Sequence, residues 1–366
     1  MPKDTRRMTM TAVAMDARIL SGQKERVGIA QYIAHLLAEY RRDHHDVDLQ
    51  PLSYEKAWSA REGVPVGVIP RIKGVPWQSI LLPWYLRRHH YDVFHGPAFS
   101  IPPWSPVPAV VTIHDATFFR MPQFVRSDTV RYLTRMVPRS LRQAARIIVP
   151  SHQVKDDLLA ITREMDPKRI TVISLGSDRL KDVIPVPRAL IDVPYFLHVG
   201  TVEPRKNLEF LLEVFACAIS LGELPHHLVL AGSNGWNNEA FWRRYEDFRW
   251  KDRVHVLGYV SDRENVRLYQ DAALYLAPSH YEGFGLGVFE ALWQGCPVIA
   301  SPTGGVRDYH VPGLACVPLG QTELWARHII DFIRDVVEVD RRHLPTWYQT
   351  YAQHARLYRE VKDGAK

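Results

Sequence analysis

Cysteine is scarce in this chain of 366 residues: Cys217, Cys296 and Cys316 are the three, and no two of them form a C-x-x-C pair. Such a set supplies neither a disulfide framework nor a zinc site, and it is typical of a protein kept in a reducing cytoplasm. The H-E-x-x-H motif is absent, and the adjacent histidine pairs have no carboxylate or cysteine at ligand spacing. We therefore expect no metal site and a cytoplasmic location.

Two common nucleotide-binding fingerprints are also missing, since the chain contains no Walker A sequence and no G-x-G-x-x-G. Their absence argues against a P-loop ATPase and against a nicotinamide-dependent enzyme. No apolar run approaches the length of a membrane span, and the opening residues do not have the continuous apolar core of a signal peptide. The sequence therefore predicts a protein that is soluble or only peripherally attached to a membrane.

Positive charge is in slight excess, with 46 Lys and Arg against 40 Asp and Glu, a net charge of +6. The excess permits nucleic acid, an anionic membrane surface or phosphorylated small molecules as partners. Nucleic-acid binders interleave basic and aromatic residues in a stripe, whereas the basic residues here are scattered, so we expect no nucleic-acid partner. The basic run 131–146 is typical of a solvated helix face, and an anionic membrane would also accept it.

Short β-branched runs alternate with longer stretches of helical period, a pattern that predicts parallel sheets with crossover helices. In the first half we expect strands within 11–19, 92–96, 109–115, 146–151 and 169–176. In the second half we expect strands within 195–200, 227–232, 254–260, 273–279 and 297–301. We also expect Ser151 and Asn207 to begin helices as N-caps.

The proline-bearing segment 181–194 interrupts this alternation, which then restarts, and the chain is longer than one hydrophobic core usually serves. The sequence therefore predicts an α/β fold with two Rossmann-like, doubly wound domains facing a central cleft. The expected domains are 1–185 and 186–344, followed by a helix at 345–366 that crosses back to the first domain. Ligands of such sheets bind beyond the carboxyl ends of the strands.

The stretch YEGFGLGVFEAL, residues 281–292, combines a glycine loop with two glutamates. It follows an expected strand and opens a helix, so its N–H groups and helix dipole suit a phosphate, although a tight turn on the surface fits the same pattern. Glu282 and Glu290 would stand roughly 12 Å apart on a helix, whereas the carboxyl pair of a retaining glycosidase needs about 5 Å. We therefore interpret the two glutamates as holding opposite ends of an elongated ligand.

Three other polar features follow expected strands or open helices. Arg205 and Lys206 stand together in HVGTVEPRKNLEF, where two cations from one loop suit a diphosphate or are simply solvated. His114 follows the apolar strand of VVTIHDATFF and is suited to donate to a sugar hydroxyl or to steady developing charge, or is an ordinary loop histidine. Gly28 stands at the start of the first long helix. The N–H groups there are suited to bind a phosphate or a hydroxyl, or Gly28 simply begins an ordinary helix.

Taken together, GTVEPRKNL, LVLAG, LGYVSD, YEGFGLGVFEALWQGCPVIAS, DVFHGPAFSIPPW and VVTIHDATFF closely resemble the retaining glycosyltransferases of family four, which have the GT-B fold. The resemblance covers most of the chain and is more specific for family and fold than for the sugar. HDATFF and HGPAF are most similar to bacterial mannosyltransferases that use GDP-mannose to build exopolysaccharide or O-antigen. The resemblance implies metal-independent transfer of a hexose to a glycan or lipid-linked acceptor, in the cytoplasm or peripherally at the anionic inner membrane.

The resemblance also implies roles for individual residues. Glu282, His114, Arg205 and Lys206 would take part in catalysis, which in this family is explained by front-face attack with the leaving diphosphate as proton acceptor. Glu282 would meet the sugar and Glu290 the ribose. Domain 1–185 would bind the acceptor, and domain 186–344 would bind the nucleotide sugar. The full set of implied donor-binding residues is Gly28, Gly200, Thr201, Arg205, Lys206, Tyr259, Val260, Glu282, Gly283, Phe284, Gly285, Leu286 and Glu290.

The sequence departs from the family pattern at three positions. Gly287 replaces a common proline and should loosen the helix start, Asp308 stands where glutamate is usual, and Val27 replaces a second glycine. Three alternatives stay open: the same reaction with a UDP-sugar, a nucleotide-sugar epimerase of the same fold, and a basic nucleic-acid-binding protein.

Overall fold

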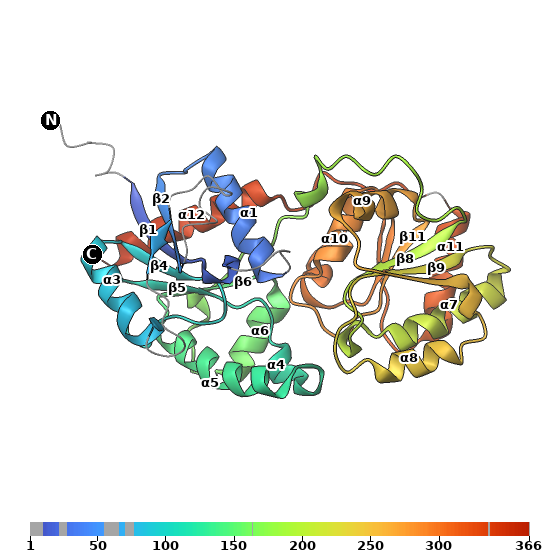
Figure 1. Ribbon diagram of the computed structural model, residues 1–366, viewed down its shortest axis with the longest axis horizontal. Helices are drawn as coiled ribbons and strands as arrows, with labels where there is room; N and C mark the ends of the chain where they lie inside the picture. Colours follow the sequence, from blue (N-terminus) through green and yellow to red (C-terminus); the bar gives the residue numbers. More distant parts are fainter. Residues whose placement is uncertain are drawn as a thin grey trace. The chain divides into compact units, whose positions relative to one another are not determined.

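The computed structural model describes residues 10–21, 28–54, 66–69, 77–162, 164–335 and 337–365. The chain divides into two compact units, one formed by Met1–Gly176 with Thr346–Lys366 and the other by Ser177–Pro345. Each unit is a sheet with helices packed on it (Figure 1). None of the described helices is long and apolar enough to cross a membrane.

The boundary between the units falls ahead of the proline-bearing segment 181–194, within which the sequence places it. That segment is held by the second unit. The Val186 N–H donates to the Arg263 carbonyl at 3.3 Å, and Arg263 Nε donates to the Ile184 carbonyl at 3.1 Å. These contacts bind the segment to helix α9 (Asp262–Asp271), in agreement with a second unit that begins at Ser177.

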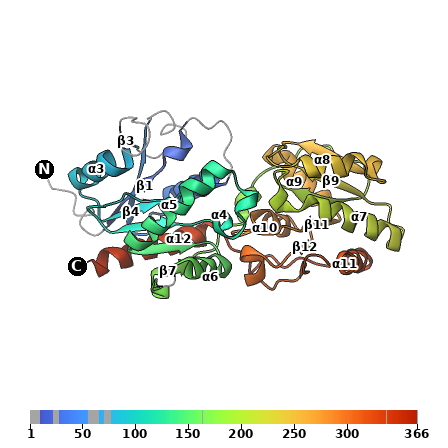
Figure 2. The ribbon, with the colours of Figure 1, turned by 90° about the horizontal axis from the view of Figure 1, so that it is seen from below.

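Within the described residues, the first unit contains a parallel sheet of seven strands in the order β3-β2-β1-β4-β5-β6-β7. The strands are β1 (Thr11–Asp16), β2 (Val47–Ser53), β3 (Gly67–Val68), β4 (Val93–Gly96), β5 (Ala109–Thr112), β6 (Arg146–Val149) and β7 (Ile170–Val172). The longer helices are α1 (Ile29–Arg42), α3 (Leu82–His89), α5 (Ser127–Gln143), α6 (His152–Ile161) and α12 (Trp347–Gly364). Helix α12 comes from the end of the chain and packs against α1, β1, β2 and β4 (Figure 2).

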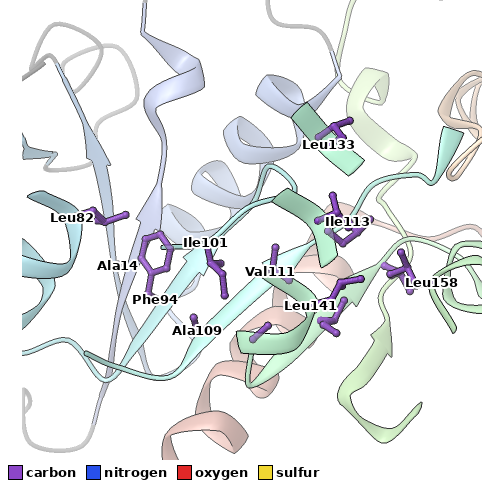
Figure 3. Packing of buried hydrophobic residues seen from close by; sticks show 14 of the residues in the cluster. Ala14, Leu82, Phe94, Ile101, Ala109, Val111, Ile113, Leu133, Leu141 and Leu158 are labelled. Carbon is purple, nitrogen blue, oxygen red and sulfur yellow. The ribbon is translucent and has the colours of Figure 1, made fainter. Parts of the chain in front are cut away.

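Alternate residues of the central strands point to opposite faces of this sheet, as the period of a strand requires. Phe94 of β4 and Val111 of β5 belong to the core that includes Leu141 of α5 (Figure 3). His95 and Thr112, their neighbours in the chain, bond instead to side chains of α12 and α1. The sheet is therefore covered on both faces, with a polar contact buried on the α1 and α12 side.

That contact is a chain of hydrogen bonds between buried groups. Its members, in order, are Tyr358, His95, Thr112, Tyr32, His354 and the carbonyl of Thr350. The carbonyl of Thr350 accepts only, so His354 donates from Nδ1 at 2.7 Å and its Nε2 accepts from the Tyr32 hydroxyl at 2.6 Å. Burial lowers the pKa of His354 to about 4 and lowers that of His95 well below its usual value, so both rings are neutral. The donor and the acceptor of each hydrogen bond in this network are therefore fixed.

The second unit contains, within its described residues, a parallel sheet of six strands in the order β10-β9-β8-β11-β12-β13. The strands are β8 (Tyr195–Val199), β9 (His227–Ala231), β10 (Val254–Gly258), β11 (Leu274–Ala277), β12 (Val298–Ala300) and β13 (Leu314–Cys316). The helices are α7 (Leu208–Gly222), α8 (Glu239–Glu246), α9, α10 (Leu286–Trp293) and α11 (Thr322–Arg334). Phe196, Leu228 and Leu276 pack with α7 and α11 on one face, and the Tyr195 hydroxyl reaches the Leu268 carbonyl of α9 on the other.

Both sheets confirm the predicted fold class, and each of the ten expected strands is present, every one of them a residue or more shorter than predicted. Ser151 caps α6 by accepting from the Val154 N–H, as expected. Asn207 is the N-cap residue of α7, as expected, but its side chain makes no capping hydrogen bond. Its backbone is left-handed (φ 57°), and the same residue also ends the short helix η7 (Pro204–Lys206).

Candidate functional site

Loops from three neighbouring strands meet at the carboxyl edge of the second sheet, where ligands of such sheets bind. The loop after β8 contains η7, the loop after β11 contains the glycine-rich stretch, and the loop after β12 contains Thr303. Hydrogen bonds tie them together. The His280 N–H donates to the Arg205 carbonyl (2.8 Å), and the Glu282 N–H donates to Thr303 Oγ1 (3.1 Å).

Arg205, Lys206 and Glu282 lie in direct contact at this edge. One carboxylate oxygen of Glu282 accepts from Arg205 Nη1 and the other from Lys206 Nζ, each at 2.7 Å. Arg205 also donates from Nη2 to Glu203 at 2.5 Å. Two cations are thus matched by two carboxylates, so their positive charge is balanced by protein groups.

The electrostatics of Glu282 follow from these contacts. Its side chain is only 15% exposed, and burial by itself raises the pKa of the carboxyl, but Arg205 and Lys206 outweigh burial and hold that pKa well below its usual range. Glu282 is therefore a carboxylate at any physiological pH, and it acts as an acceptor rather than as an acid.

The glycine-rich stretch opens helix α10 and has two demanding positions. Gly285 has φ +96°, which favours glycine, and it stands directly before the first residue of the helix. At Gly287 a Cβ would lie 2.5 Å from the hydroxyl of Tyr275, which itself donates to the Val199 carbonyl. The sequence suggests that Gly287 loosens the helix start; in the structure the Tyr275 hydroxyl occupies the space that a side chain would take.

Glu290 lies in α10 and binds a residue that sequence reasoning missed. Arg179 Nε donates to Glu290 Oε1 at 2.9 Å, and Arg179 Nη1 donates to Asp262 at 2.5 Å. Glu290 is 8% and Arg179 11% exposed, and the Tyr269 hydroxyl approaches Glu290 Oε2 at 3.5 Å. Burial lowers the pKa of Arg179, but the two carboxylates outweigh it and raise that pKa. The signal in the sequence was an arginine just beyond the last strand of the first half, next to the expected domain boundary.

The remaining expected residues of the second unit surround these two clusters. Gly200 and Thr201 follow β8, and Tyr259 and Val260 follow β10 and adjoin the capping box of α9, which places them beside Asp262. Tyr259 is exposed. Among Gly283, Phe284 and Leu286 of the glycine loop, only Phe284 is deeply buried, stacked on Phe289.

His114 and Gly28 belong to the first unit. His114 Nε2 donates to the Pro97 carbonyl at 2.7 Å, and burial lowers the pKa of the ring. A neutral His114 therefore offers Nδ1 as an acceptor, whereas the sequence suggested a donor. Gly28 is the N-cap of α1 with φ +54°, and a Cβ there would meet no described atom within 4 Å. No group of three or more potential metal ligands occurs among the described residues.

Comparisons with known proteins identify the family. Residues 27–179 match the model Glycosyltransferase Family 4, and residues 187–344 match the model Glycosyl transferases group 1. O-antigen chain mannosyltransferase B of Escherichia coli is 31% identical over 260 residues, which cover 69% of this chain and 68% of that protein. The chain belongs to glycosyltransferase family 4. This glycosyltransferase is also 29% identical over 195 residues to the O-antigen chain mannosyltransferase RfbU of Salmonella typhimurium, over 52% of this chain and 51% of the relative.

Solved structures agree with the glycosyltransferase fold. Anabaena HepE in complex with UDP and glucose has a TM-score of 0.64 at 18% identity, over 97% of this chain and 98% of that one. The lipopolysaccharide outer core galactosyltransferase WaaB has a TM-score of 0.67 at 16% identity, over 96% and 100%. The fold is thus GT-B, with two Rossmann-like domains, and the protein is a glycosyltransferase.

Proposed function

We propose that this glycosyltransferase moves mannose from GDP-mannose, with retention, onto a glycan or lipid-linked acceptor. The observation that carries the proposal is the cluster of Arg205, Lys206 and Glu282 at the start of α10, which offers two cations for a diphosphate and one carboxylate for sugar hydroxyls. The relatives named as O-antigen mannosyltransferases support mannose as the sugar.

In the proposed reaction the bond between the anomeric carbon and the diphosphate oxygen breaks, and the acceptor hydroxyl attacks from the same face. The departing phosphate oxygen takes the acceptor's proton. Arg205 and Lys206 stabilise the negative charge that grows on the diphosphate, and this electrostatic term is usually the largest single one in catalysis. Glu282 orients the sugar hydroxyls, and Glu290 accepts from the ribose. No resident metal is part of the proposal.

A panel of nucleotides and nucleotide sugars tests the donor. We expect GDP to raise the melting temperature more than UDP or ADP, because a ligand that binds only the folded state stabilises it. GDP-mannose with a lipid-linked acceptor should yield product in EDTA, with the anomeric configuration of the donor by NMR. A larger shift of the melting temperature with UDP would make a UDP-sugar the donor in place of GDP-mannose. Stabilisation by an oligonucleotide alone would overturn the transferase proposal, and a product of inverted anomeric configuration would rule out front-face attack.

Glu290→Gln should weaken GDP binding by about tenfold, because a charged acceptor for ribose hydroxyls is lost and Arg179 loses its buried partner. Isothermal titration calorimetry measures the change. Glu323→Gln, which alters an exposed ion pair with Arg327, is the matched control and should leave GDP affinity unchanged. Unchanged affinity in Glu290→Gln would remove Glu290 from the ribose site.

We also propose that helix α5 contacts an anionic membrane surface. Arg131, Arg135 and Arg139 recur every fourth residue and are exposed, whereas Leu133 and Val137 on the other side are buried. This arrangement places a row of positive charge on one helix face, complementary to acidic lipid headgroups.

Reversing the three arginines to glutamate should reduce binding to phosphatidylglycerol vesicles by more than about 100-fold, since each basic residue near such a surface contributes about 1 kcal/mol. Co-sedimentation with phosphatidylglycerol vesicles measures this binding, and phosphatidylcholine vesicles serve as the uncharged reference. A control with Arg327, Arg342 and Arg356 reversed has the same net charge and should still bind. Equal loss in both variants would show that net charge, and not α5, governs the contact.

A further inference from the structure

A small cavity of about 20 Å³ lies in the second unit beneath the loops of the donor site. Lys206, Glu282 and Thr303 line it on the side of the ion cluster, and His198 and Tyr275 line it from strands β8 and β11. The proposed reaction has used Lys206 and Glu282, but it gives no role to His198.

The hydrogen bonding of His198 fixes which ring nitrogen can accept. Nδ1 lies 2.8 Å from the Leu276 carbonyl, and since a carbonyl only accepts, Nδ1 must hold the proton. Burial, followed by the charge of Lys206, lowers the pKa of His198 to about 4, so the ring is neutral and Nε2 has a free lone pair. The side chain is 1% exposed, and Nε2 has no hydrogen-bond partner within the parts of the chain that the structure describes.

Lys206 is the cation close to this lone pair. Gly200 separates the two: a Cβ built there would lie 3.2 Å from His198 Nε2 and 3.3 Å from Lys206 Cε. The absence of a side chain at Gly200 thus leaves the space between the imidazole and the lysine open. A buried acceptor without a donor is costly, so the lone pair should acquire a partner in some state of the protein.

We propose, on the basis of the proposed function, that His198 is a positioning residue: when the donor diphosphate binds, Lys206 leaves Glu282 and donates one N–H to His198 Nε2 and another to the diphosphate. Glu282 is thereby released to the sugar hydroxyls. A neutral acceptor suits this role, because it orients the ammonium and leaves its full charge directed at the phosphate, whereas a carboxylate neutralises it.

Two substitutions distinguish the role of Nε2 as a hydrogen-bond acceptor from the structural role of His198. His198→Asn keeps a donor toward the Leu276 carbonyl and has no atom at the place of Nε2, whereas His198→Gln puts an amide oxygen near that place. We expect His198→Asn to lose about tenfold in affinity for GDP and to bind GMP as the wild type does, with His198→Gln within about threefold of the wild type for both. Calorimetry with each nucleotide measures these ratios.

Nitrogen-15 NMR of the imidazole gives a second readout that a purely structural role would not move. GDP should shift the Nε2 resonance from that of an unbonded lone pair to that of an acceptor, while Nδ1 keeps its proton. Three outcomes would each overturn the role of His198 and leave the proposed function intact. They are wild-type affinity for GDP in His198→Asn, an equal loss of affinity for GDP and GMP in that variant, and an Nε2 resonance that GDP does not shift. A wild-type protein that binds neither GDP nor UDP would overturn the proposed function and this inference with it.

Discussion

Glu282→Gln is expected to reduce hexose transfer by about 100-fold or more while tightening the binding of GDP. Transfer falls because the sugar hydroxyls lose a charged acceptor that orients them in the transition state. GDP binds more tightly because the carboxylate that now occupies Arg205 and Lys206 no longer competes with the diphosphate. A charge-assisted hydrogen bond of this kind corresponds to about tenfold in affinity.

The measurement is the dissociation constant of GDP by calorimetry, beside turnover with the nucleotide sugar. Glu323→Gln serves again as the control, because its ion pair with Arg327 is exposed and remote from the loops of the site. From spacing alone the sugar end and the phosphate end look independent, so the sequence would leave GDP affinity unchanged. Weaker GDP binding in Glu282→Gln would show that Glu282 organises the two cations and does not compete for them.

Mild acid is expected to destabilise the first unit through His95 and His354. Both rings have a lowered pKa when folded, so the stability that they contribute is present above the unfolded value near 6.5 and is lost as the pH falls below it; for His354 the loss extends to a pH of about 4. For His354 alone the shift corresponds to about 3 kcal/mol of unfolding free energy. Protonating His354 Nε2 also removes the acceptor of the Tyr32 hydroxyl.

Hydrogen exchange of the α12 amides between pH 7.5 and 4.5, corrected for the intrinsic rate, measures the stability of the first unit alone. This separation is needed because the lowered pKa of His198 makes the stability of the second unit fall with pH in the same direction. His354→Gln should be less stable at neutral pH but should show a shallower dependence on pH. His310→Gln, at an exposed position, should keep the wild-type slope. A wild-type slope in His354→Gln would mean that other groups govern the acid response.

The strands that could be predicted from the sequence are those with a continuous run of apolar or β-branched side chains. The run Ala109–Thr112 is β-branched and buried on both faces, so it is recognisable as a strand. Strand β2 was missed because Pro51 and the polar Asp48 and Gln50 interrupt its apolar pattern. The three-residue β13 is only partly buried and carries no such pattern.

The pairing of the candidate site residues could not be predicted from the sequence. Arg205, Lys206 and Glu282 each follow a strand, as the sequence indicated, yet ion pairs between residues 76 or 77 positions apart depend on how the loops fold and cannot be derived from spacing. Arg179 and His198 were assigned no role from the sequence. Both gain their meaning only from the partners that the fold brings to them.

The first unit is discontinuous, because Ser177–Pro345 is inserted between its sheet and helix α12. During synthesis the second unit emerges whole before residues 346–366 leave the ribosome, so we expect it to fold first, although its sheet is the later one in the chain. Until α12 arrives, Tyr32 and His95 have no access to His354 and Tyr358. Helix α12 is therefore made after the whole second unit, although it completes the first.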